Sequence, residues 1–207
     1  MAFIKKTGTP VTGDEARKGA RDSAGLVAQL TDVDPAVRRW AARDLQAYPE
    51  ATSALVARLQ SEDDVSVREI ILTSLTRLGG AVAVAGLVDC LRSENAQLRN
   101  EAIEAMKELP DEVSPIMDGL LVDEDADVRI MAVNILESLR HPRVEAWLIE
   151  VIERDPVVNV CGTAVDLLGE VGTPASQVAL THLKQRFASE PYIQFAADLA
   201  LKRIGKA

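Results

Sequence analysis

Four arginines recur along the chain at nearly constant spacing. Arg38, Arg68, Arg99 and Arg129 are separated by 30, 31 and 30 residues. A row of guanidinium groups could bind an anionic ligand, because arginine presents a fork of donors to phosphate or carboxylate. Each arginine also has acidic residues within one helical turn, and a buried arginine needs a partner. We therefore expect these arginines to pair with acids of their own or neighbouring turns.

Acidic side chains cluster just before two of these arginines. The densest group is Asp123, Glu124, Asp125 and Asp127, and residues 62–64 form a shorter one. A calcium loop would place oxygen ligands at alternating positions around a central glycine, with a distant bidentate glutamate. Neither group has that order. Both are more typical of helix caps and solvated turns.

The few remaining reactive side chains form no recognisable catalytic set. His141 and His182 are the only histidines and stand far apart, which argues against a two-histidine metal site or a histidine-based triad. Cys161 stands next to Gly162 and is either a reactive thiol or a buried packing residue. Cys90 lies on an apolar stripe and is expected in the core. Glycine-rich phosphate loops and Cys-x-x-Cys pairs are absent, so we expect no metal, no cofactor and no catalytic residue.

The arginines belong to a repeated phrase, in which a capping residue precedes Val-Arg or Leu-Arg by three or four positions. Asp and Asn are favoured helix N-caps, and proline is favoured at the first helical position. Two weaker copies lead to Cys161 and Gln194, the first with about two extra residues in its turn. The expected cap positions are Asp34, Asp64, Asn95, Asp125, Asp155 and Glu190. Proline follows the cap in three copies, at Pro35, Pro156 and Pro191.

Each copy predicts one helix, and a second helix fills the interval before it. Apolar residues follow helical spacing, as in Val67, Ile71, Leu75 and Leu78, and no segment alternates with the period of a strand. The filling helices are expected at 14–30, 50–60, 81–92, 112–122, 143–153 and 174–187. A pair of about 30 residues cannot bury its apolar faces alone, so the pairs should stack into a solenoid. The predicted repeats are 14–48, 49–79, 80–110, 111–141, 142–172 and 173–205, which form a single domain after a flexible tail at 1–13.

The phrase Asp34-Pro35-x-Val37-Arg38-x-x-Ala41-x-x-x-Leu45 resembles the HEAT repeat. Its short period is similar to the subclass called PBS-lyase HEAT-like repeats. The resemblance implies an all-α fold, a right-handed α–α superhelix of about six helix pairs, with the Val-Arg helices on the concave side. It also implies a structural ladder of turn residues and arginines, interrupted at Cys161 and Gln194. The ladder residues are Asp34, Arg38, Asp64, Arg68, Asn95, Arg99, Asp125 and Arg129.

The outward positions of the Val-Arg helices are the expected partner-binding surface. Trp40 is the outlier among them, and two interpretations stay open. Trp40 is either a binding anchor near Arg39 and Arg43, since Trp and Arg are typical hot spots, or a cover over the end of the core. The predicted partner-binding residues are Arg39, Trp40, Arg43, Glu69, Thr73, Asn100, Glu104, Lys107, Ile130, Asn134 and Glu137.

The charge distribution narrows the choice of partner. The net charge is −9, and residues 61–170 alone carry −14, whereas both ends are mildly basic. Such an acidic surface disfavours nucleic acid and a HEAT-like DNA glycosylase, and it favours a basic protein surface. No apolar run reaches the length of a membrane span, no signal peptide is apparent, and two cysteines are typical of a reducing cytoplasm.

These observations favour a cytoplasmic, non-catalytic scaffold or adaptor that binds another protein along its concave surface. The alternative is a subunit of a chromophore (bilin) lyase-type enzyme, because the repeat subclass takes its name from phycobilisome lyases. No membrane partner is expected.

Overall fold

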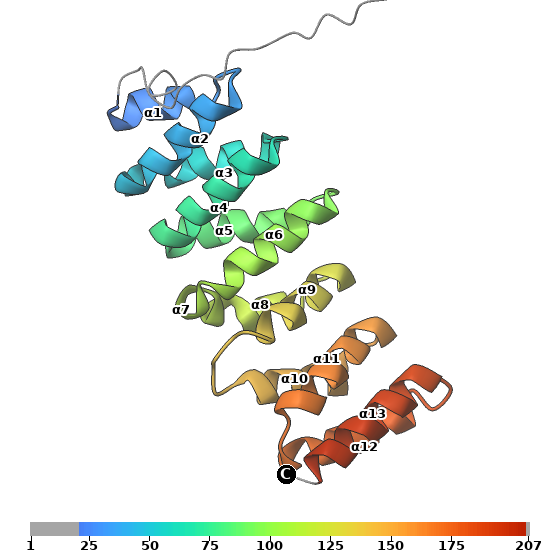
Figure 1. Cartoon of the computed structure of the whole chain (residues 1–207). Helices are drawn as coiled ribbons and strands as arrows, with labels where there is room; N and C mark the ends of the chain where they lie inside the picture. Colours follow the sequence, from blue (N-terminus) through green and yellow to red (C-terminus); the bar gives the residue numbers. More distant parts are fainter. Residues whose placement is uncertain (1–20, 206–207) are drawn as a thin grey trace, which may run out of the picture. The chain divides into compact units, whose positions relative to one another are not determined.

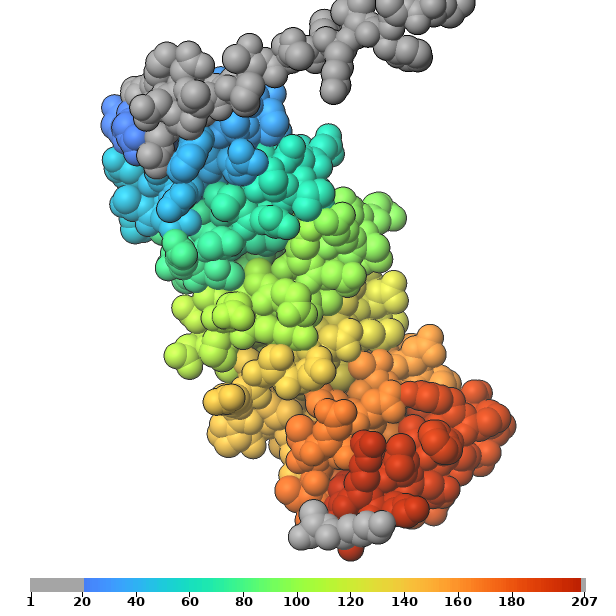
Figure 2. Space-filling model, viewed as in Figure 1, coloured from blue at the N-terminus to red at the C-terminus, as the bar shows by residue number. Residues whose placement is uncertain are grey.

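A computed structural model describes residues 21–205, and within that range every regular element is a helix. The predicted all-α class is confirmed. Helices alternate along the chain as short antiparallel pairs, shown in Figure 1, and no helix in the described range is long and apolar enough to cross a bilayer. The chain divides into two compact units, Met1–Gly86 and Leu87–Ala207, with the boundary inside one helix. Figure 2 shows the surfaces of the two units, coloured along the chain.

Unit 1 contains the first helix pairs. Its second helices are α2 and α4, which carry Arg38 and Arg68. Its elements are α1 (Ser23–Gln29), α2 (Pro35–Asp44), the 3₁₀ turns η1 (Leu45–Ala47) and η2 (Pro49–Ala51), α3 (Thr52–Ser61), α4 (Val65–Leu78) and the beginning of α5 (Gly80–Cys90). The helix expected at 14–30 is seen from Ser23 onward, and its earlier part, like the tail at 1–13, lies outside the described residues.

Local sequence explains where the helices of unit 1 begin and end. The Asp34 carboxylate accepts a hydrogen bond from the Ala36 N–H, and Pro35 is the first residue of α2, as predicted. Helix α4 ends before Gly79 and Gly80, whose φ angles are 60° and 78°. This left-handed region is open to glycine and costly for other residues. The two glycines therefore reverse the chain between α4 and α5.

The core of unit 1 consists of aliphatic side chains at helical spacing. Ile71 and Leu75 of α4 are fully buried together with Leu55 and Leu59 of α3. Gly86 of α5 lies directly against Val56 of α3, and an added Cβ there would stand 2.5 Å from both Val56 methyl groups. The close approach of α5 to α3 depends on that glycine.

Unit 2 continues the alternation of first and second helices. Its second helices are α6, α9, α11 and α13. The elements after α5 are α6 (Ala96–Lys107), α7 (Pro110–Val113), η3 (Ser114–Ile116), α8 (Met117–Leu120), α9 (Ala126–Leu136), α10 (Val144–Arg154), α11 (Val158–Val171), η4 (Pro174–Ser176), α12 (Gln177–Arg186) and α13 (Pro191–Ile204). Trp147 of α10 is 1% exposed and is the largest fully buried side chain of this core.

The continuous helix expected at 112–122 is wrong. The segment is divided into α7, η3 and α8, and α8 has only four residues. Pro115 explains the division, because its ring and its missing N–H interrupt the hydrogen-bond ladder of a helix interior. Gly119 weakens the segment that follows, since glycine is a poor helix former.

The cap expected at Asp155 is also wrong. Helix α11 begins at Val158, its N-cap is Val157, and Pro156 lies outside the helix. Asp155 instead ends α10, and its carboxylate accepts a hydrogen bond from the Val157 N–H at 2.9 Å. The interval from Val157 to Cys161 is four residues, the same as from Asp34 to Arg38. The turn therefore contains no extra residues between cap and arginine position.

Candidate protein-binding surface

A repeated turn positions each second helix, and its arginine binds back onto that turn. In unit 1 the Arg38 guanidinium donates to the backbone oxygens of Asp32 and Val33 at 2.9 and 3.2 Å, six and five residues before it. Arg68 donates to the backbone oxygens of Glu62 and Asp63, both at 3.2 Å. The preceding acid closes the turn from the other side, since the Glu62 carboxylate accepts from the Asp64 N–H.

The same turn recurs in unit 2. Arg99 donates to the Ser93 oxygen at 2.6 Å, and Arg129 donates to the Asp123 and Glu124 oxygens at 2.7 and 3.3 Å. Asn95 and Asp125 cap α6 and α9 with their side-chain oxygens. The guanidinium groups thus hold their own turns together.

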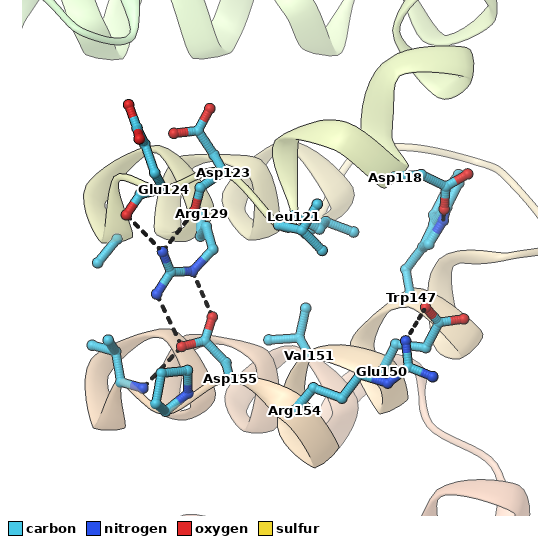
Figure 3. Close-up of a pocket in the computed structure, with 14 residues that line it drawn as sticks. Asp118, Leu121, Asp123, Glu124, Arg129, Trp147, Glu150, Val151, Arg154 and Asp155 are labelled. Atoms are coloured by element: carbon cyan, nitrogen blue, oxygen red, sulfur yellow. Dashed lines mark hydrogen bonds and ion pairs between the residues drawn. The ribbon is translucent and has the colours of Figure 1, made fainter.

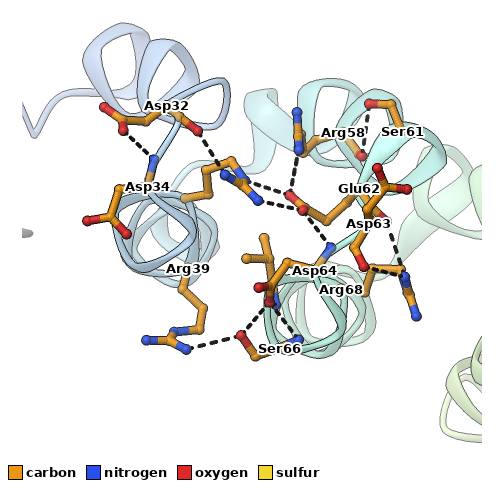
Figure 4. A network of polar contacts seen from close by, with 12 residues as sticks. Asp32, Asp34, Arg39, Arg58, Ser61, Glu62, Asp63, Asp64, Ser66 and Arg68 are labelled. Atoms are coloured by element: carbon orange, nitrogen blue, oxygen red, sulfur yellow. Dashed lines mark hydrogen bonds and ion pairs between the residues drawn. The ribbon is translucent and has the colours of Figure 1, made fainter. Parts of the chain in front are cut away.

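Two of the arginines also form buried ion pairs with the acid of the next turn along the chain. Arg38 pairs with Glu62 through two hydrogen bonds of 2.8 and 2.7 Å, and Arg129 pairs with Asp155 at 2.6 and 3.1 Å. Figure 4 shows Glu62 between two guanidinium groups, because Arg58 reaches the same carboxylate. These contacts lower the Glu62 pKa to about 2, against the opposing effect of burial. Arg38 and Arg129 are therefore engaged in structure, as expected, and are poorly placed to bind an anion.

The side chains one and five positions after each arginine point away from the turn. In unit 1 these are Arg39 and Arg43 on α2, and Glu69 and Thr73 on α4, all exposed. Arg39 donates to the Ser66 hydroxyl at 3.0 Å, which joins α2 to the start of α4. Thr73 donates to the Glu69 backbone oxygen. We call the exposed side chains of α2 and α4 the unit 1 second-helix surface.

Trp40 adds an aromatic ring to the unit 1 second-helix surface. It is half-buried, and the Arg43 guanidinium carbon lies 5.4 Å from its ring centroid. A cation over an aromatic face is held by the ring quadrupole. The partly exposed ring and its neighbouring cation fit the anchor interpretation, and the buried part of the ring fits the covering one.

In unit 2 the corresponding predicted residues lie on α6, α9 and the turn after α9. Asn100 and Glu104 are exposed, whereas Ile130 and Asn134 are partly buried. Lys107 bridges two carboxylates, with its Nζ 3.0 Å from Glu104 and 3.3 Å from Glu137. This part of the surface is mixed in charge and carries its own ion pairs.

The family model of HEAT repeats matches residues 23–107 and 113–202. This chain belongs to the HEAT-repeat family. A curated relative, the bilin biosynthesis protein PecE of Nostoc sp., is 39% identical over 75 residues. That match covers 35% of this chain and 30% of PecE, so the chain spans less than a third of the relative's length.

Solved structures with similar folds share little sequence with these HEAT repeats. The archaeal HEAT-like repeats protein from Thermococcus onnurineus is 15% identical, with 87% of this chain and 86% of that chain covered and a TM-score of 0.49. Human deoxyhypusine hydroxylase is 21% identical, with 94% and 77% covered and a TM-score of 0.47. The complex of CpcE and CpcF of phycocyanin lyase from Nostoc is 19% identical, with 99% and 98% covered and a TM-score of 0.36.

The fifth and sixth HEAT repeats keep the arginine position but change its residue. The Cys161 Sγ donates to the Asp155 backbone oxygen, six residues before it, at 3.3 Å. Gln194 donates to the backbone oxygens of Lys184 and Phe187. Cys161 therefore binds the turn six residues back, as the arginines do, whereas Gln194 binds the end of α12, ten and seven residues back. The sequence pattern had already placed both residues near the arginine position, and their hydrogen bonds follow only from the structure.

The last HEAT repeat exposes apolar side chains that the sequence reasoning missed. Phe195 and Leu199 stand one and five positions after Gln194, and they are 67% and 38% exposed. Tyr192 lies one turn before Phe195 on the same helix, and its hydroxyl donates a hydrogen bond to the Asp166 carboxylate. Gly162 makes room for that ring, because an added Cβ would stand 3.0 Å from Tyr192 Cε1. The signal was available once Gln194 was placed in the arginine register.

The two thiols and two imidazoles stand at four different places in the described HEAT repeats. Cys90 and Cys161 are buried, and burial raises both thiol pKa values to about 11. His141 stacks on Trp147 at 4.9 Å, and His182 is exposed on α12. Across residues 21–205 no three His, Cys, Asp or Glu side chains are grouped to hold a metal ion.

Proposed function

We propose that this HEAT-repeat chain is a scaffold that binds another protein through the exposed side chains of its second helices, without catalysis of its own. The observation that carries the proposal is the pair formed by Trp40 and Arg43 on α2. The ring is partly exposed, the cation lies 5.4 Å from it, and Arg43 is exposed to solvent. Tryptophan and arginine in such positions are the residues that most often dominate protein interfaces.

The neighbouring contacts support a prepared surface around this pair. The Arg39–Ser66 hydrogen bond joins α2 to α4, and Ser74 of α4 donates to the Ala42 backbone oxygen at 2.9 Å. The two helices are thus held in register, so that a partner meets a rigid surface and little ordering entropy is lost.

The acid distribution supports a partner with a basic surface. Residues 61–170 carry a net charge of −14. Ion pairs and caps use part of that charge, and Glu104 is itself paired with Lys107, but Glu69 is exposed at a second-helix position. Complementary charge mainly raises association rate and specificity, so salt should weaken the complex.

The test is capture of a specific partner by the purified chain, followed by measurement with the purified partner. Combining Trp40→Ala with Arg43→Glu should weaken binding by at least tenfold, whereas a control with Val82→Ala and Gln60→Glu, both exposed on first helices, should bind normally. Circular dichroism establishes that both variants are folded. A partner retained in full by the Trp40/Arg43 variant would place the binding surface elsewhere.

A second candidate function rests on the 75-residue similarity to PecE, whose name refers to bilin biosynthesis. In that case the chain would be a subunit of a chromophore lyase-type enzyme. Mixing the chain with a bilin and an apo-phycobiliprotein would then yield a covalent coloured adduct. An adduct that survives denaturation and depends on the chain would favour this function over the scaffold.

A further inference from the structure

A cavity of about 550 Å³ opens in unit 2 between the turn after α8 and helix α10. Leu121 and Val122 line one wall, and Trp147 and Val151 line the other, as Figure 3 shows for the labelled residues. The volume is within the usual range of ligand sites, and apolar walls with a few polar groups are typical of them. We call this cavity the α8–α10 slot.

The slot exists because α8 ends early. Helix α10 continues to the residue directly before Asp155, whereas α8 ends at Leu120, three residues before Asp123. Asp123 and Asp155 are equivalent, since Arg129 and Cys161 bind their backbone oxygens in the same way. The residues that would extend the helix form a turn instead, and Val122 is left 76% exposed. The space between α8 and α10 is therefore open to solvent at this point.

The equivalent space between α10 and α12, the next pair of first helices in unit 2, is filled by an arginine. Arg186, the last residue of α12, extends to the end of α10 and donates to the backbone oxygens of Ile152 and Asp155 at 2.6 and 2.5 Å. Arg154 is the last residue of α10 and holds the matching position, but its side chain is 78% exposed. The chain thus fills the space between α10 and α12 with Arg186 and leaves the space between α8 and α10 open.

The charges around the slot favour a cation. Its lining includes five carboxylates and two guanidinium groups. Asp118, Asp123 and Asp155 are already paired with arginines, which leaves Glu124 and Glu150 as the carboxylates without a close cation. One of the guanidinium groups, Arg129, is already paired with Asp155. Glu150 on α10 makes a long contact of 3.9 Å to Arg154, lies within electrostatic range of Arg143, and is about half exposed. Glu150 is therefore available to a charged guest.

We propose that the α8–α10 slot binds an arginine side chain of a partner protein. The aliphatic stem would lie between Leu121 and Val151, and the guanidinium would meet Glu150 and the backbone oxygens that follow α8. Arginine suits the site better than lysine, because its planar fork donates to several oxygens at once, as Arg186 does between α10 and α12. The proposal rests on the protein-binding function but uses side chains other than those around Trp40.

The experiment titrates N-acetyl-arginine methylamide into the full chain labelled at methyl and indole groups, with the citrulline analogue as an uncharged probe of the same shape. We expect the methyl resonances of Leu121 and Val151 and the Trp147 indole N–H to shift. The arginine probe should bind at least tenfold more tightly than the citrulline probe. Equal binding of both, or shifts confined to other residues, would overturn the proposal.

A matched pair of variants tests the role of charge. Glu150→Lys should weaken binding of the arginine probe by at least tenfold, whereas Glu153→Lys, exposed on the same helix but outside the slot, should leave it within twofold. Unchanged binding by Glu150→Lys contradicts the proposal. Binding that is seen only in the Arg154→Ala variant would also contradict the proposal, because the chain's own Arg154 would then be the occupant of the slot. The combined Trp40→Ala and Arg43→Glu variant should bind the probe normally, which separates failure of the slot from failure of the proposed surface.

Discussion

Arg38 of α2 and Glu62 at the end of α3 form a two-point ion pair across 24 residues of sequence, with nitrogen–oxygen distances of 2.8 and 2.7 Å. The Glu62 side chain is fully buried, and Arg58 binds the same carboxylate at 2.8 Å. This carboxylate thus joins two arginines and closes the turn before α4.

Replacing Glu62 with glutamine should destabilise the chain by about 3 kcal/mol, since removal of one partner leaves a buried charge without compensation. Urea unfolding followed by circular dichroism measures the shift of the midpoint. Asp63→Asn in the same turn is the control, because Asp63 is exposed and contributes through its backbone oxygen. Equal midpoints for the two variants would show that the ion pair contributes little.

The Glu62 pKa is about 2 in the folded chain, compared with 4.5 for an unperturbed glutamate. A carboxyl whose folded pKa is lowered stabilises the fold above the unfolded pKa and loses that effect as pH falls through the folded one. The free energy of unfolding should therefore drop more steeply between pH 4.5 and 2 for the wild type than for Glu62→Gln. Urea titrations at several pH values measure both slopes, and parallel slopes would assign the acid sensitivity to other carboxyls.

Both thiols should resist modification until the chain unfolds. Cys90 and Cys161 are 2% and 0% exposed, and their pKa values of about 11 leave little thiolate at pH 8. Labelling with an aromatic disulfide reagent should be slow for the native chain and complete within minutes in urea. Rapid native labelling that disappears in Cys161→Ser would identify Cys161 as a reactive residue after all.

Gly86→Ala should destabilise unit 1 by about 1–3 kcal/mol, because the new Cβ overlaps both methyl groups of Val56. Adding Val56→Ala removes the overlap and should recover stability relative to Gly86→Ala alone. Thermal unfolding of the two single variants and the double variant measures this coupling. Additive effects would mean that the helices relax without strain.

The sequence pattern predicted the architecture well where local chemistry decides it. The caps at Asp34, Asp64, Asn95 and Asp125 are confirmed, because an Asx side chain at a helix start satisfies nearby N–H groups wherever the helix packs. The pattern failed at Asp155, which looks like a cap but is taken by Arg129 from the preceding repeat. Tertiary pairing of that kind leaves no local signal.

The sequence predicted which positions along the second helices form the candidate site, but not the contacts of their side chains. Counting from Arg38 places the exposed side chains Arg39 and Arg43, whereas the same positions after Arg129 are partly buried. The pairing of Lys107 with Glu137 depends on how α6 packs beside α9. The α8–α10 slot has a weaker signal still. Pro115 and Gly119 indicate a broken helix, but the empty space follows only from where Arg154 and Arg186 direct their side chains. The assignment of the predicted residues to a partner, and the single domain over 14–205, stay predictions.

The Arg129–Asp155 pair also determines where this array can be divided. Arg129 is 8% exposed and belongs to the turn of its own repeat, while the acid that compensates it stands at the end of α10. A fragment that stops at the loop before α10 would lose the counter-charge of Arg129 together with the end of α10 that lies beside it. A fragment or an inserted repeat should therefore end after the acidic residue that closes the following helix. The loops between helix pairs are the wrong places to cut.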